Sequence, residues 1–150
     1  MNIIIGIFVV ILMLTVYQVN GIDFKDCGAT TGVVSSITVS DCPPTAQSCA
    51  FKSGNNETID VKFKSEIDSN TASVKIWGII AGVPIPFNLP SDACGHYNIK
   101  CPINKDNNYE LTVTVPILSQ YPKIKLDVRV ALMDSNKSKI FCEQFPVQIQ

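Results

Sequence analysis

The feature that most constrains the fold is a regular alternation of apolar and polar residues. Residues 109–117 and 124–132 carry apolar side chains at every second position, and residues 59–63 do the same over a shorter span. Alternation of period two places one set of side chains in a core and the other in water, as in a β-strand. Weaker strand patterns cover 33–39, 73–80 and 140–149, and turn-forming residues separate the segments. No amphipathic helix pattern lies between them, so the sequence predicts an all-β sandwich of two antiparallel sheets with about seven strands.

The first 21 residues have the composition of a secretory signal peptide. Residues 3–16 are almost wholly apolar, no charged side chain precedes Asp23, and Val19 and Gly21 are small enough for a cleavage site. The apolar run is shorter than the roughly 20 residues that a membrane-spanning helix needs. We therefore expect residues 1–21 to be removed and residues 22–150 to form one exported domain. The alternative is an uncleaved membrane anchor.

Six cysteines follow the leader, and an even number in an exported chain indicates disulfide bonds. Two pairs each enclose a short loop rich in turn formers, which leaves one pair to join the ends of the domain. The predicted bridges are Cys42–Cys49, Cys94–Cys101 and Cys27–Cys142. A zinc site is the alternative, but six residues between ligands exceed the usual spacing of about two to four. We expect no metal and no cofactor.

Charge and motifs argue against two classes of function. The net charge is −1 and the chain has no basic cluster, so we expect no nucleic-acid partner. The single histidine, His96, lies in the loop between two cysteines, and the chain contains neither a Gly-x-Ser-x-Gly elbow nor a His-Glu-x-x-His pair. The sequence therefore predicts that the protein is not an enzyme.

Residues 78–87 form an apolar segment interrupted by Pro84 and Pro86. Proline cannot donate a hydrogen bond to a neighbouring strand, so the segment cannot be a central strand throughout. It nevertheless keeps Val83, Ile85 and Phe87 apolar, which predicts a partner or a cavity that covers them. The alternative is a bent edge strand that packs on its own core.

Several motifs resemble the ML (lipid-recognition) domain family, and the closest resemblance is to its soluble sterol carriers. The motifs are FKDCG at 24–28, GVPIPF at 82–87, CPI at 101–103, YPKIKL at 121–126, and FC at 141–142 with PVQI at 146–149. The resemblance covers essentially the whole chain after the leader. It implies an immunoglobulin-like β-sandwich whose two sheets part to admit a lipid, together with the same three disulfides.

The resemblance also implies roles for individual residues. It places Phe87, Ile117 and Tyr121 at the mouth of a lipid pocket, and we add Val83 and Ile85 as lipid-binding candidates. It implies that a surface projection docks on a membrane or on a membrane sterol receptor. The residues of this projection are Ala81, Gly82, Val83 and Pro84. Two departures weaken the match to a specific partner: Ala81 is small for this projection, and the Glu143-Gln144 pair is unusually polar.

Two sequons match the N-glycosylation pattern at predicted turns. They begin at Asn56 and Asn136, and the resemblance places a family glycan at Asn56. We expect both to be glycosylation sites.

The resemblance implies a secreted or lysosomal monomer that carries a sterol such as cholesterol and delivers it through transient contact with membranes. One alternative is a carrier of fatty acids or small hydrophobic signals. Another is an immune co-receptor that presents lipid, which needs a basic rim around the cavity. The lysines available for such a rim are Lys62, Lys64, Lys75, Lys123 and Lys125.

Overall fold

A computed structural model describes residues 21–150, so the predicted signal peptide lies outside the described residues except for Gly21. The strands are β1 (Lys25–Asp26), β2 (Gly32–Val39), β3 (Cys49–Phe51), β4 (Asn56–Ser65), β5 (Ser73–Ile80), β6 (Val83–Pro86), β7 (Asn108–Pro116), β8 (Lys125–Met133) and β9 (Lys139–Ile149). All six predicted strand segments are present, as β2, β4, β5, β7, β8 and β9. Within the described range no helix could cross a membrane.

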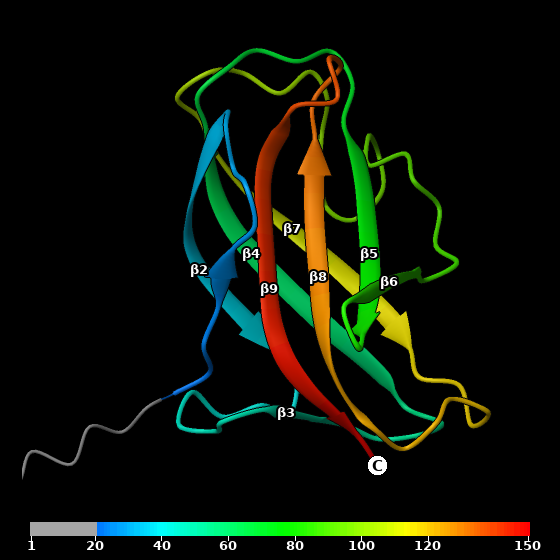
Figure 1. Cartoon of the computed structure of the whole chain (residues 1–150). Helices are drawn as coiled ribbons and strands as arrows, with labels where there is room; N and C mark the ends of the chain where they lie inside the picture. The colour runs from blue at the N-terminus through cyan, green and yellow to red at the C-terminus, as the bar shows by residue number, and fades with distance from the viewer. Residues whose placement is uncertain (1–20) are drawn as a thin grey trace, which may run out of the picture.

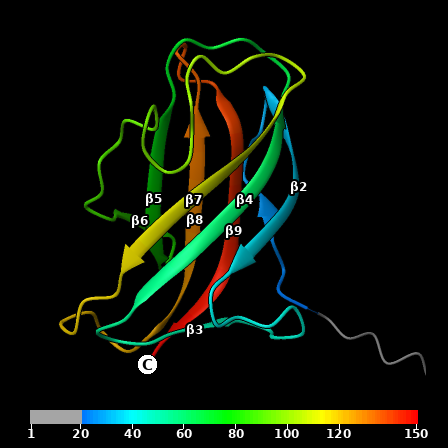
Figure 2. The same cartoon turned by 180° about the vertical axis from the view of Figure 1, so that it is seen from behind.

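The strands form two packed layers (Figures 1 and 2). The larger sheet has the order β1-β9-β8-β5-β6, and the smaller sheet has the order β2-β4-β7. In Figure 1 the smaller sheet crosses behind the larger one, and Figure 2 shows it in front. The predicted antiparallel sandwich is therefore confirmed, with one local difference: the short β3 pairs with β9 in parallel.

The core lies between the layers, because each strand turns alternate apolar side chains inward. In β4 these are Ile59, Val61 and Phe63, and in β8 they include Val128 and Val130, all almost inaccessible to solvent. The polar partners of the alternation, such as the lysines of β4, lie on the outer face. The two-residue period of the sequence thus places the core directly.

Three disulfides brace the sandwich, and they are the three pairs expected from the spacing. Two close short loops, and the third ties the N-terminal segment to β9 across a sequence separation of 115 residues. The bonded pairs are Cys27–Cys142, Cys42–Cys49 and Cys94–Cys101.

The proline-containing segment forms a hairpin with β5 at the edge of the larger sheet. Ile80 pairs with Val83, and both intervening residues have positive φ, 49° at Ala81 and 80° at Gly82. This is the geometry of a two-residue type I′ turn. Three residues beyond the hairpin's first proline, the Phe87 N–H donates to the Ile76 carbonyl at 2.9 Å.

That hydrogen bond explains how the prolines are accommodated. Successive residues of a strand direct their N–H groups to opposite sides. The Phe87 N–H faces β5, and Pro84 and Pro86 lie an odd number of residues before it. Their nitrogens therefore face the free edge of the sheet, where no hydrogen-bond donor is required. The segment thus runs along the edge of the larger sheet, but the four residues of β6 are exposed rather than packed on the core as the edge-strand alternative supposed.

Candidate functional site

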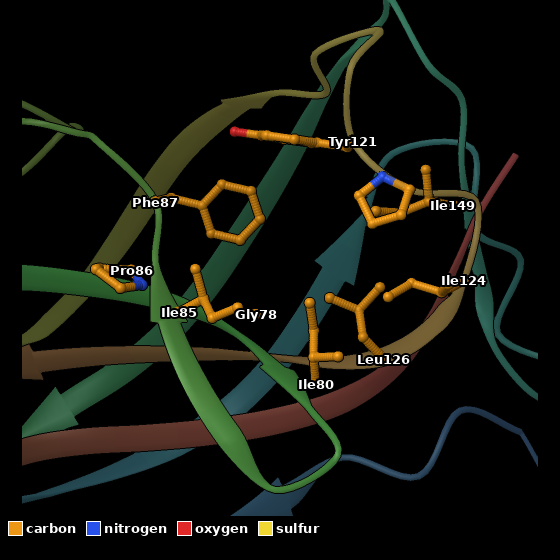
Figure 3. A pocket seen from close by; sticks show the side chains of 10 residues that line it. Gly78, Ile80, Ile85, Pro86, Phe87, Tyr121, Ile124, Leu126 and Ile149 are labelled. Carbon is orange, nitrogen blue, oxygen red and sulfur yellow. The ribbon is translucent and has the colours of Figure 1, made fainter.

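An apolar pocket of about 260 Å³ opens at one end of the sandwich. The β5–β6 hairpin, the 117–124 connection, the start of β8 and the end of β9 meet there. The lining residues are Gly78, Ile80, Ile85, Pro86, Phe87, Tyr121, Pro122, Ile124, Leu126 and Ile149. Figure 3 shows the rings of Phe87 and Tyr121 facing the branched side chains of Ile80, Leu126 and Ile124 across the hollow.

Two aromatic side chains from different elements shape the mouth of this pocket. Phe87 is anchored through its backbone to β5, whereas Tyr121 comes from the turn-rich connection between β7 and β8. Their ring centroids lie 6.0 Å apart at an interplanar angle of 76°, an edge-to-face contact. Both residues are half-buried and pack against the core, so part of each side chain stays accessible to a ligand.

The lining carries no charged side chain, and the Tyr121 hydroxyl is its one polar side-chain group. Such a pocket can bury an apolar body, but its walls offer no partner for a carboxylate or a phosphate. The arrangement therefore suits binding by shape and apolar contact, with a single hydroxyl for orientation.

The structure brings three of the five lipid-binding candidates together in the pocket: Phe87, Tyr121 and Ile85. Ile117 lies instead in the core, 1% exposed, and does not line the pocket. Val83 is 59% exposed and also stays outside the lining. It pairs with Ile80, however, so its side chain shares the pocket-facing side of the hairpin.

Seven lining residues were not singled out from the sequence. Four of them, Ile80, Ile124, Leu126 and Ile149, continue the inward alternation to the ends of their strands, and this signal was available. The remaining three are Gly78, Pro86 and Pro122, whose residue types give no apolar-pocket signal by themselves.

The four predicted docking residues lie beside the pocket. Two form the turn between β5 and β6, two form the first half of β6, and all four are exposed. Ile85 is also a large exposed apolar side chain, 50% exposed. Val83 and Ile85 lie on the pocket-facing side of the hairpin and form an apolar rim.

The five candidate lysines do not gather into one basic rim, although all are exposed. Lys62 and Lys64 lie on the outer face of β4, and Lys75 lies on the outer face of β5. Only Lys123 and Lys125 flank a lining residue, Ile124, in the sequence. This arrangement gives little support to a site for anionic head groups.

The two sequon asparagines are both exposed. Asn56 begins β4, and Asn136 lies in the β8–β9 turn, where its N–H donates to the Asp134 carboxylate at 2.8 Å. Their glycosylation stays a prediction.

Glu143, the polar residue noted in the sequence, is buried on β9. It projects from the same face of the strand as Phe141 and Phe145 and is 8% exposed. Its cross-strand partner is Asp26 of β1. Burial, and secondly the Asp26 charge, raise the pKa of Glu143. Backbone N–H groups of Ala29 and Gly28, at 2.8 and 2.7 Å, lower the pKa of Asp26.

Within residues 21–150, no three His, Cys, Asp or Glu side chains are grouped so as to hold a metal ion.

Comparison with known proteins gives consistent matches. A family model described as the ML domain matches residues 21–149. NPC intracellular cholesterol transporter 2 of the dog is 38% identical over 130 residues, covering 86% of this chain and 85% of its own. NPC intracellular cholesterol transporter 2 homolog a of Drosophila melanogaster is 31% identical over 130 residues, covering 86% and 88%.

Solved structures match the fold. A Niemann-Pick type C2 protein from the Japanese carpenter ant superposes with a TM-score of 0.80 at 29% identity, covering 85% of this chain and 99% of its own. Chicken MD-1, solved in complex with lipid IVa, has a TM-score of 0.57 at 17% identity, covering 85% and 88%, and shares the fold alone.

Proposed function

The chain belongs to the ML domain family, and from that premise we propose that it is a sterol-binding lipid transfer protein. It holds the apolar body of the sterol in the pocket between the β5–β6 hairpin and the 117–124 connection. The observation that carries the proposal is the pocket lining, which is apolar throughout apart from the Tyr121 hydroxyl. Relatives named cholesterol transporters support sterol as the ligand class.

The pocket volume is close to the lower limit for small-molecule sites, and we infer that its walls move apart when a sterol binds. Pockets for small-molecule ligands usually measure roughly 300–1,000 Å³, and this one measures about 260 Å³. Ile85, Phe87 and Tyr121 belong to an edge hairpin and a connection rather than to central strands, so they can separate without breaking the core. A sterol thus enters by displacing the hairpin from the connection.

The energetics of such binding are sufficient. Burial of roughly 400 Å² of apolar sterol surface contributes about 10 kcal/mol at about 25 cal/mol per Å². Lost translational freedom and side-chain ordering oppose binding by several kcal/mol. If these costs amount to about 4 kcal/mol, the remaining roughly 6 kcal/mol corresponds to a dissociation constant of tens of micromolar. No bond is made or broken in this cycle, so the protein acts as a carrier and not as an enzyme.

Delivery uses the apolar rim. Val83 and Ile85 are exposed on the pocket-facing side of the hairpin, and Ala81, Gly82, Val83 and Pro84 form its turn and the first half of β6. Contact of this rim with a membrane, or with a membrane sterol receptor, removes apolar surface from water while the pocket opens toward the acceptor. Removal of residues 1–21 would release residues 22–150 as a secreted or lysosomal monomer.

The proposal is tested by titrating residues 22–150 with dehydroergosterol, whose fluorescence changes on transfer to an apolar site. We expect saturable binding of one sterol per chain in the micromolar range, with displacement by unlabelled cholesterol. A long-chain fatty acid that competes more strongly than cholesterol would favour the fatty-acid carrier instead.

A further inference from the structure

Gly78 is an unusual residue for its place in the fold. It lies within β5, paired with Ile85 on one side and Val128 on the other. Its φ lies outside the positive range, so the backbone conformation does not require glycine. Glycine inside a strand weakens the strand and often marks a point where a ligand or another backbone approaches closely.

The surroundings of Gly78 distinguish these two explanations. A Cβ built on Gly78 would lie 2.9 Å from the Leu126 Cδ1 and 3.8 Å from the Phe87 Cε2, and both atoms belong to side chains that line the pocket. At Gly32, by contrast, a Cβ would lie 2.6 Å from the backbone carbonyl of Ile140. Gly32 is thus required by close backbone packing. At Gly78, by contrast, the place of a side chain is taken by the Leu126 side chain, which belongs to the pocket wall.

The direction of the missing side chain follows from the register. Gly78 pairs directly with Ile85, and cross-strand partners project from the same face of a sheet. Ile85 lines the pocket, so any side chain at position 78 would project into it. Gly78 therefore lets the Leu126 side chain lie against the strand backbone, and an added methyl group would push Leu126 toward the pocket.

We propose that Gly78 is a specificity-determining residue that selects rigid, flat ring systems over flexible chains. This inference rests on the proposed sterol-binding function and names the residue that favours it. A side chain added at position 78 would displace Leu126 into the pocket, and a fused ring system cannot bend around this obstruction. A flexible acyl chain can follow another path through the same pocket. Added bulk at position 78 thus weakens ring ligands more than chains.

The experiment compares Gly78→Ala and Gly78→Val with the unchanged protein, using dehydroergosterol and the fluorescent fatty acid cis-parinaric acid. One extra methyl or methylene group in a fitted pocket typically changes binding by roughly 10–200-fold. We expect about a tenfold loss of sterol affinity for Gly78→Ala and a larger loss for Gly78→Val, with fatty-acid affinity changed less than threefold. Equal losses for both ligands, or unchanged sterol affinity, would overturn the assignment.

Rescue separates a steric effect in the pocket from a loss of folding. Because the nearest atom to the added methyl is the Leu126 Cδ1, which valine lacks, Gly78→Ala combined with Leu126→Val should recover sterol affinity relative to Gly78→Ala alone. Failure to recover, with all variants melting normally, would contradict a spatial role. Ile79→Ala, on the outward face of β5, serves as the matched control and should leave both affinities unchanged. If the unchanged protein binds no sterol, the proposed function itself fails.

Discussion

The three side chains that the family resemblance places at the pocket mouth divide into one that stabilises the fold and two that can contact a ligand. Ile117 is fully enclosed by the core, so its loss acts on stability first. Phe87 and Tyr121 are half-buried and touch each other edge-to-face. The part of each ring that stays exposed can be covered by a ligand. We therefore expect ligand affinity to depend most on these two side chains.

Replacing Phe87 by Ala is therefore expected to weaken dehydroergosterol binding by roughly 10–100-fold, since contact with a buried aromatic ring contributes about 1.5–3 kcal/mol. The thermal melt should fall by only a few degrees because the ring is partly exposed already. Tyr121→Phe is the matched control: it keeps the ring and should retain most of the affinity. Normal binding by Phe87→Ala would remove Phe87 from the pocket assignment.

Glu143 gives a prediction about pH. Its raised pKa means that the folded protein holds this proton more tightly than the unfolded chain does. Below the ordinary carboxyl pKa of about 4.3 the group is protonated in both states. As the pH rises through that value toward the raised pKa, the unfolded state loses its proton first, and folding stability declines.

Glu143→Gln removes this penalty. The variant should melt at a higher temperature than the unchanged protein at pH 7 and at nearly the same temperature at pH 3.5. Asp26 has a lowered pKa and contributes the opposite dependence, stabilising the fold above its ordinary pKa, but it is present in both proteins. Melting curves across pH 3–8 measure the difference, and a gap that widens toward low pH would contradict this account.

At the scale of elements, the sequence predicted the long strands and missed the short ones. β2, β4, β5, β7, β8 and β9 follow from alternation, because each has one buried face. β1 and β3 have only two and three residues, too few for any period to emerge, and their pairing with β9 depends on disulfide-closed loops. For the segment that forms β6, the sequence is compatible with both a segment covered by a partner or cavity and an edge strand.

The candidate site was predictable only in part for a related reason. Alternation tells which side chains face the interior but not which end of a strand lies under an opening. The sequence therefore does not distinguish Ile117 and Val83 from Phe87 and Ile85 as candidates for lining the pocket. The structure separates them by position: Ile117 lies in the enclosed core, and Val83 lies at the exposed tip of the hairpin. The close approach of the Leu126 side chain to Gly78 likewise follows only from the three-dimensional structure.

The β5–β6 hairpin gives a prediction that separates carrying from delivering. Val83→Asp places a charge on the apolar rim, where contact with a membrane would leave that charge desolvated and unpaired. Sterol transfer between vesicles should slow by about tenfold or more, whereas equilibrium sterol binding should change little because Val83 is outside the lining. Val83→Thr, similar in shape, is the matched control. Unchanged transfer by Val83→Asp would assign the hairpin a purely structural role.

For the whole molecule, the three disulfides differ in what they stabilise. Cys27–Cys142 closes a loop with a sequence separation of 115, whereas the other two close separations of 7. In the chain-entropy model, loops of about 100 residues contribute about 4.7 kcal/mol and loops of about 15 residues about 3 kcal/mol.

Replacing Cys27 and Cys142 together by Ala should therefore cost about 4–5 kcal/mol of unfolding free energy, more than either local pair. Urea denaturation of the three double variants provides the comparison. A larger loss for the Cys42 and Cys49 pair would show that the long bridge does not govern the stability of the sandwich.

Whether the pocket carries a sterol is tested most directly by identifying the lipid that the purified protein holds. The protein is purified without detergent from cells that supply both sterols and fatty acids, extracted with organic solvent, and the extract is analysed by mass spectrometry. We expect the extract to contain sterol at up to one molecule per chain. The extract of Phe87→Ala, purified in parallel, should lack this sterol. An extract that contains fatty acids in stoichiometric amount and no sterol would contradict this account.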